Sequence, residues 1–187
     1  MRWMWIDRIV ELVPRERLVA IKNVSMAEEH LHDHFRAEAG EGGAPGRAAV
    51  PIMPASLIIE GMAQTAGILV GHAEGFAEKV ILAKVGLAEL EREVTPGQTL
   101  RYTAVVKQMD RMGASTEGTV EVLDHVGGGG FEKIGRIDLM FSHLDQNMSG
   151  EKFPEHNFVF GESFKTVLAM SGIGWEGTEG RRDEGTQ

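Results

Sequence analysis

Residues 50–71, VPIMPASLIIEGMAQTAGILVG, decide the fold. Apolar side chains occur on nearly every side of a helix drawn through this stretch, and such a helix is normally buried in a core. Two prolines stand near its start, and Gly71 is expected to cap its end. Glu60 and Gln64 interrupt the apolar run, and because they are four residues apart they share one face. A buried carboxylate is costly unless it is paired or used, so Glu60 is the first candidate functional residue.

Segments with the pattern of β-strands surround this helix. Residues 99–108 alternate, which places Leu100, Tyr102, Ala104 and Val106 on one face of a half-buried strand. Similar patterns predict strands at 6–13, 18–25, 79–90, 115–123 and 131–144. About six mostly antiparallel strands and one long buried helix make an α+β fold. We expect this domain to span residues 1–144.

Residues 145–187 differ from the rest of the chain, and we treat them as a C-terminal extension of unknown role. Glycine is frequent there, and residues 174–187 have the composition of a disordered tail. Phe164, Val167 and Leu168 are spaced as on one face of a short helix over residues 161–171.

Composition excludes several classes of function. The 187-residue chain has no cysteine, which rules out disulfides and thiolate catalysis. Its net charge of −9 argues against nucleic-acid binding through bulk charge. No apolar run is long enough to cross a membrane, and the first residues lack a signal-peptide pattern. We therefore expect a cytoplasmic protein that binds neither nucleic acid nor membrane.

Five separated blocks resemble, in order, the β-hydroxyacyl-acyl-carrier-protein dehydratases of the FabZ and FabA types: IDRIVEL, LVAIKNVS, HDHF, PIMPASLIIEGMAQTAGIL and VTPGQTLRYTAVV. FabZ is the more similar type. The resemblance implies a hot-dog fold, in which an antiparallel sheet wraps around one long helix. It also implies dehydration of 3-hydroxyacyl-acyl-carrier-protein to trans-2-enoyl-acyl-carrier-protein in fatty-acid biosynthesis, without a cofactor. The expected partners are an acyl carrier protein or coenzyme A thioester and a second subunit, in a homodimer or a trimer of dimers.

The resemblance also assigns site residues. The family's catalytic histidine falls on His34 and its catalytic carboxylate on Glu60, where glutamate rather than aspartate favours the FabZ type. The backbone N–H that binds the thioester carbonyl falls on Ala55, and the carbonyl that orients the histidine falls on Ile52. Gln64, one turn after Glu60, is expected to hydrogen-bond at the site or within the core.

These groups suit the reaction that the resemblance implies. A histidine titrates near neutral pH and can remove the proton at C2. Desolvation favours the neutral form of a carboxyl group, so Glu60 can protonate the leaving hydroxyl at C3. N–H groups at a helix start stabilise negative charge on the thioester oxygen, which is the role given to Ala55. In the family, the histidine and the glutamate of one site belong to different subunits.

The chain departs from the family pattern in three places. A Gly-rich insertion, residues 36–49, lengthens the link between His34 and Glu60, and long surface insertions cost little stability. Asp33 replaces the glycine before the histidine, and Ala55 replaces the glycine at the helix start. These changes bear on how substrate is handled more than on the fold.

Other functions stay open from the sequence. The same fold serves acyl thioesterases, in which Glu60 would activate water, and polyketide-type dehydratases. Glu60 could instead pair with a buried basic group and only hold the helix in place. A non-catalytic acyl-binding protein is a further alternative. Carrier docking would need a basic patch on this acidic chain, for which Arg36, Arg47 and Lys84 are the candidates.

The histidines of residues 27–35 support a different kind of site. His30, His32 and His34 alternate, so on a strand all three would face one way, close to Asp33. Imidazole and carboxylate groups bind zinc and iron. A metal-binding hot-dog protein is therefore an alternative, although the favoured expectation is that no metal is bound.

Overall fold

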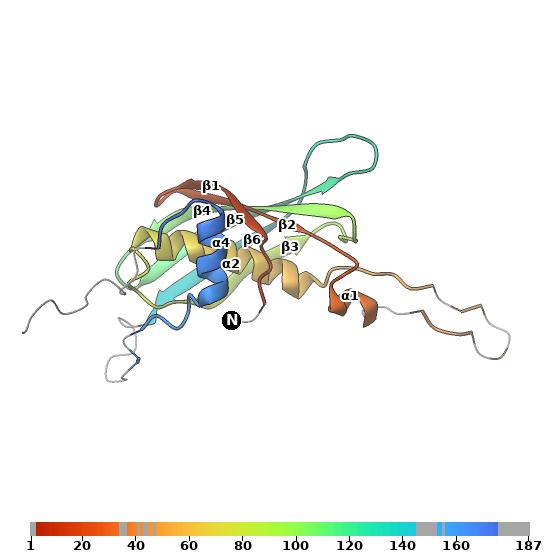
Figure 1. Cartoon of the computed structure of the whole chain (residues 1–187), viewed down its shortest axis with the longest axis horizontal. Coiled ribbons are helices and arrows are strands. Elements are labelled where there is room, and N and C mark those ends of the chain that lie inside the picture. The colour runs from red at the N-terminus through yellow and green to blue at the C-terminus, as the bar shows by residue number, and fades with distance from the viewer. Residues whose placement is uncertain are drawn as a thin grey trace, which may run out of the picture.

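A computed structural model describes residues 3–33, 37–40, 42, 45–46, 48–144, 153–154 and 156–175, with only the backbone given at 32 and 33. Six strands form one antiparallel sheet in the order β1-β2-β4-β5-β6-β3 (Figure 1). The strands are β1 (Arg8–Val13), β2 (Arg17–Asn23), β3 (Val80–Leu90), β4 (Gln98–Met109), β5 (Gly113–Asp124) and β6 (Glu132–His143). The prediction of an α+β fold with about six antiparallel strands is confirmed.

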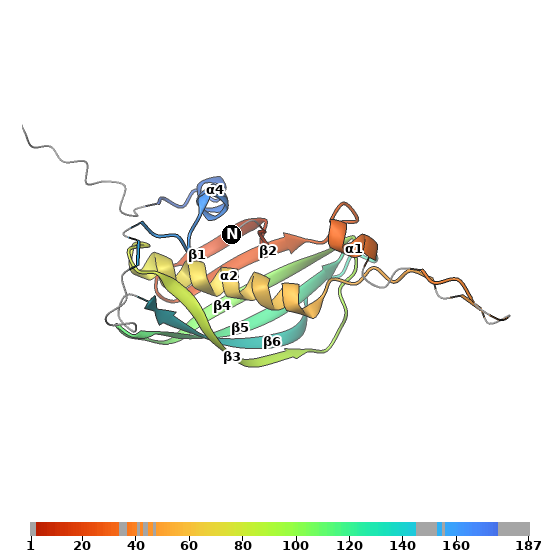
Figure 2. The ribbon, with the colours of Figure 1, turned by 90° about the horizontal axis from the view of Figure 1, so that it is seen from below.

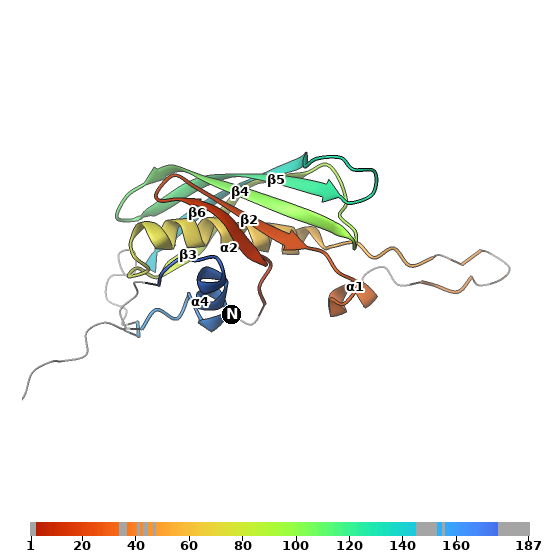
Figure 3. The ribbon, with the colours of Figure 1, turned by 45° about the horizontal axis from the view of Figure 1, so that its top comes forward.

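Helix α2 (Ala55–Ala73) lies along the inner face of the curved sheet, as predicted (Figures 2 and 3). Its bounds differ from the prediction, because the chain up to Pro54 is extended and Gly71 lies inside the helix. The helix ends two residues later in a Schellman motif, with Gly75 in the left-handed conformation at φ +59°. In this motif the Phe76 N–H donates to the Gly71 carbonyl over 2.8 Å.

The inner face of the sheet follows the predicted alternation. Leu100, Tyr102 and Ala104 of β4 are fully buried under α2. Two glycines allow the helix to come close to the sheet. A Cβ on Gly61 would lie 2.6 Å from the Tyr102 ring, and one on Gly118 of β5 would lie 2.5 Å from the Met62 sulfur. The depth at which α2 sits is therefore fixed by these two contacts.

A short C-terminal helix, α4 (Glu162–Met170), forms where the sequence predicts one. It buries Phe164, Val167 and Leu168, which are the three apolar residues of the predicted face. Figures 1 and 2 place it beside β1, on the side of α2 that the sheet does not cover. The Ile9 N–H of β1 donates to the Ser171 Oγ over 3.1 Å, so the segment after α4 covers part of this sheet edge.

Helix α1 (Glu29–Asp33) occupies the stretch in which the histidines alternate. On a helix, positions two apart point to nearly opposite sides, so the strand geometry behind the metal hypothesis is wrong for His30 and His32. Among the residues whose placement is given, no helix is long and apolar enough to span a membrane.

Candidate active site

Glu60 lies on the second turn of α2 and is half-buried. The Gln64 Nε2 donates a hydrogen bond to its Oε1 over 2.9 Å. Within the part of the chain that the structure describes, no lysine or arginine pairs with Glu60. Among those residues, the alternative of a buried ion pair that anchors the helix is therefore not observed.

Gln64 fastens the N-terminal segment to the helix beside Glu60. Its side chain is 3% exposed. Its Oε1 accepts from the Trp5 N–H over 2.8 Å, and its Nε2 also donates to the Trp3 carbonyl over 3.0 Å. One amide thus satisfies two backbone groups and orients a carboxylate, which a carboxylate or an apolar residue at position 64 could not do.

The start of α2 presents the groups that the family resemblance singled out. Ala55 is exposed at the first helical position, where N–H groups have no acceptor within the helix. The preceding chain is fixed, because the Met53 N–H donates to the Val94 carbonyl over 2.8 Å. Ile52 is buried next to it. This terminus is the positive end of the helix dipole, which suits an oxyanion.

Tyr102 lies beneath Gly61, directly behind the Glu60 turn. Burial raises its pKa far above the ordinary value, and the carboxylates of Asp7 and Glu28 add to this effect. Its hydroxyl has no hydrogen-bond partner among the described residues. Tyr102 therefore stays neutral and serves as packing for the helix.

A cavity of about 190 Å³ opens beside Glu60. On α2 it is lined by residues three and four apart, which form one stripe: Glu60, Ala63, Gln64 and Gly67. Phe141 and the start of β3 form one wall, and Val159, Phe160 and Phe164 form another. The carboxyl group therefore faces an apolar space of the size of a small acyl group.

A second hollow, of about 560 Å³, lies beside the first turn of α2. Leu57, Trp3, Trp5 and His30 contribute to its lining. Leu57 precedes Glu60 by three residues, so the two spaces flank the same stretch of helix.

Several predicted site residues lie outside the described residues. These are His34 and the basic residues Arg36 and Arg47. The side chain of Asp33 is not described either, while the described part of residues 36–49 is exposed, as expected of a surface insertion. Among the described side chains no group of three metal-binding residues occurs.

His30, one member of the predicted metal cluster, packs its ring against Trp5 with centroids 5.1 Å apart.

Sequence reasoning missed the C-terminal wall of the cavity. Phe160 and Phe164 belong to the C-terminal extension, for which the sequence predicts no role. One signal was present, because Ala63, Gly67 and Gly71 repeat every four residues and leave a shallow track along the helix. Nothing in the sequence indicates which ring fills it.

Comparison with known proteins agrees with this arrangement. A family model described as a FabA-like domain matches residues 2–126. A 3-hydroxyacyl-[acyl-carrier-protein] dehydratase FabZ from Acidiphilium cryptum is 40% identical over 112 residues, 58% of this chain and 60% of its own. The FabZ of Levilactobacillus brevis is 38% identical over 112 residues, 59% of this chain and 68% of its own. The chain thus spans less than two thirds of the first relative's length.

Solved structures share the fold at low identity. A coenzyme A complex of an acyl-CoA hydrolase mutant from Staphylococcus aureus superposes with a TM-score of 0.51 at 14% identity, over 74% of this chain and 70% of that one. An acyl-CoA hydrolase from Agrobacterium tumefaciens gives 0.51 at 13% identity, over 73% of this chain and 46% of that one. The sheet wrapped around α2 is a hot-dog fold. With the family model matching well over half of its residues, this chain belongs to the FabA-like family.

Proposed function

We propose that this protein dehydrates 3-hydroxyacyl thioesters to trans-2-enoyl thioesters. The observation that carries the proposal is Glu60, a half-buried carboxyl group that faces an apolar cavity and has an amide rather than a cation as its partner. Membership of the FabA-like family and identity to FabZ dehydratases support the same reaction. The reaction would serve fatty-acid biosynthesis.

The proposed mechanism breaks a C2–H and a C3–O bond and forms the C2–C3 double bond, with water as the second product. His34 removes the C2 proton. Glu60 donates a proton to the departing hydroxyl. The Ala55 N–H stabilises the negative charge that develops on the thioester oxygen. Gln64 holds Oε1 of the carboxyl group, which leaves Oε2 to carry the proton.

The exposed edge of the sheet at β3 supports a homodimer. Among the described strands β3 has no neighbour on its outer side, and its apolar residues Leu82 and Val85 are each 41% exposed. An exposed apolar edge strand invites pairing with another chain. In the proposed homodimer, as in the family, His34 of the partner subunit would supply the base for Glu60, so that each site is shared.

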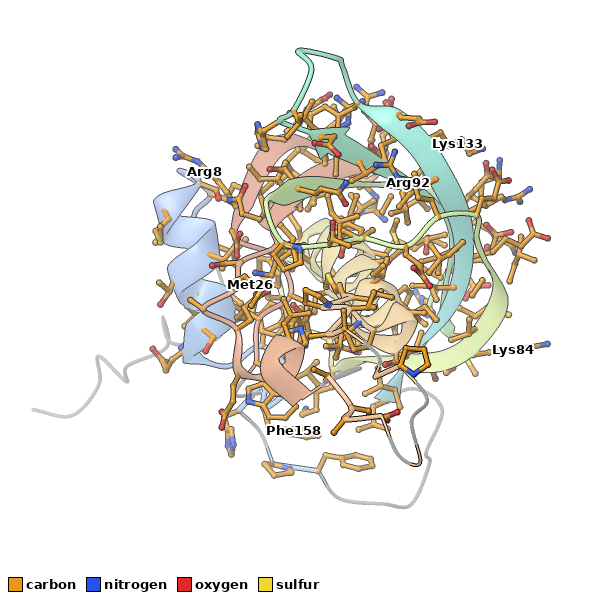
Figure 4. The ribbon with its side chains drawn as sticks, turned by 90° about the vertical axis from the view of Figure 1, so that its right-hand side faces the viewer. Arg8, Met26, Lys84, Arg92, Lys133 and Phe158 are labelled. Carbon is orange, nitrogen blue, oxygen red and sulfur yellow. The ribbon has the colours of Figure 1, made fainter. Side chains whose placement is uncertain are left out.

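The carrier of the acyl group is an acyl carrier protein or coenzyme A. Figure 4, which looks at the end where α2 begins, shows Lys84 pointing outward from β3. Arg92, on the same view, is paired with Glu132 and Asp124 and contributes less net charge. Of the three candidate basic residues for carrier docking, Lys84 is the one that the structure describes. Comparing kcat/KM for the same acyl group on both carriers decides between them.

One assay distinguishes dehydration from hydrolysis. The purified protein is incubated with a 3-hydroxyacyl thioester while enoyl absorbance and free thiol are followed together. We expect enoyl formation without thiol release. Thiol release without enoyl formation would assign an acyl thioesterase instead, and neither signal on either carrier would refute catalysis on this substrate class.

A further inference from the structure

The cavity beside Glu60 ends abruptly on the side away from the start of α2. Ala63 and Gly67, of the track of small residues along α2, line it. Gly71, the next residue of the track, lies about 16 Å along the helix from Glu60 at 1.5 Å per residue and does not line the cavity. At Gly67 the track borders the cavity, and an added Cβ would meet the Phe141 ring at an ordinary contact distance of 3.6 Å. At Gly71 it is filled, because an added Cβ would lie 2.5 Å from the Phe160 ring.

Phe160 is held firmly in this position. It is 2% exposed. Its ring centroid lies 5.1 Å from that of Phe76 and 5.5 Å from that of Phe164, both at steep edge-to-face angles. Trp175 stacks on Phe76 at 4.5 Å behind it. Aromatic pairs with this geometry stabilise the packing beyond the contribution of the area that they bury.

We infer that Phe160, backed by Phe164, closes the acyl-binding groove and restricts this protein to short acyl chains. The inference rests on the proposed function, since it takes the Glu60 cavity as the acyl site. The space of about 190 Å³ beside Glu60 is small. The preferred substrate is therefore a 3-hydroxyacyl thioester with a short acyl chain.

The stop comes from a part of the chain that the family match does not include. The FabA-like model ends at residue 126, whereas Phe160 and α4 follow β6. The extension thus does more than cover the β1 edge of the sheet. It also limits the length of the cavity beside Glu60, which lies on α2, within the residues that the family model matches.

Three variants test whether Phe160 closes the acyl-binding groove. Phe160→Ala removes the ring and lengthens the groove. Gly67→Ala adds a methyl group to its floor at an ordinary contact distance, so this variant folds even where Phe160→Ala is too unstable to study. Met170→Ala, at an exposed position on α4, is the matched control.

Two readouts are compared for each variant over acyl chains of increasing length, from four carbons upward. The first is kcat/KM for dehydration of 3-hydroxyacyl pantetheine thioesters. The second is the Kd, by calorimetry, of saturated acyl pantetheine thioesters, which lack the hydroxyl group and cannot be dehydrated. A methylene that no longer fits costs about tenfold or more.

We expect wild type to lose about tenfold or more in both readouts for each methylene beyond the limit. Phe160→Ala should move the limit to longer chains, Gly67→Ala to shorter ones, and Met170→Ala should leave it in place. A wild type that favours long chains, a limit unchanged in both groove variants, or no acyl binding at all would overturn the inference. If the chain-length limit moves in the Kd measurements while no enoyl product forms, the role of Phe160 in closing the acyl site stands and the proposed dehydratase activity is refuted.

Discussion

Replacing Gln64 by glutamate tests whether its amide orients Glu60. The substitution is nearly isosteric and keeps the oxygen that accepts from the Trp5 N–H. It removes the two hydrogen bonds donated by Nε2, at 2.9 Å to Glu60 and 3.0 Å to the Trp3 carbonyl. Each such bond is worth about 1 kcal/mol net, and more to a charged acceptor. The free energy of unfolding should therefore fall by about 2 kcal/mol or more at neutral pH.

The same variant should depend on pH. Because two acceptors face the introduced carboxyl group, folding favours its protonated form and raises its pKa above the unfolded value of about 4.3. The penalty is therefore complete at neutral pH and shrinks as the pH falls through the raised pKa. Urea unfolding at one fixed protein concentration measures it, with Gln108→Glu at an exposed site of β4 as the control. Equal losses in the two variants at neutral pH would refute the role of the amide.

Three further outcomes follow from the packing around α2 and from the free edge of the sheet. Tyr102 is the only tyrosine of the chain, and burial raises its pKa. Above a pH of about 10 only the unfolded state therefore ionises, and the free energy of unfolding should fall by up to about 1.4 kcal/mol per pH unit. Tyr102→Phe should remove this loss, and tyrosinate absorbance that appears in the native protein would contradict it. Gly61→Ala should destabilise the protein by about 1–3 kcal/mol through overpacking on the Tyr102 ring, less the ~1 kcal/mol gained in helix propensity. Gly67→Ala should instead stabilise the protein by up to ~1 kcal/mol. Denaturant unfolding of both variants compares them, and equal effects would be inconsistent with the close approach at position 61. Val85→Lys on β3 should convert a dimer to monomers by light scattering while Val126→Lys should not, and a dimer that survives would place the interface elsewhere.

The sequence was sufficient for the architecture because the architecture depends on periodic patterns. The alternation through Leu100, Tyr102 and Ala104 identifies the inner face of β4, and the run around Glu60 identifies the buried helix. The end of that helix was misplaced at Gly71. A glycine in a helix can terminate it or admit a neighbouring ring, and only the fold reveals that Phe160 lies over this one.

The candidate site was predictable only in part for the same physical reason. Glu60 and Gln64 stand out within one helix, where spacing alone places them together. Their partners Trp3 and Trp5, and the wall made by Phe160, come from distant parts of the chain with no periodic relation to α2. The alternation of His30 and His32 was misleading, because a pattern of two has a common face only on a strand, and α1 is a helix.

The most direct measurement of the central claim is the dehydration rate of Glu60→Gln. General acid–base groups contribute about a hundredfold to ten-thousandfold, so kcat should fall by at least about a hundredfold while the fold and the Kd for a saturated acyl thioester are retained. Glu132→Gln, at an exposed ion pair on β6, should keep the wild-type rate. A Glu60→Gln protein that forms enoyl thioester as fast as wild type would contradict the assignment of this carboxyl group as the catalytic acid.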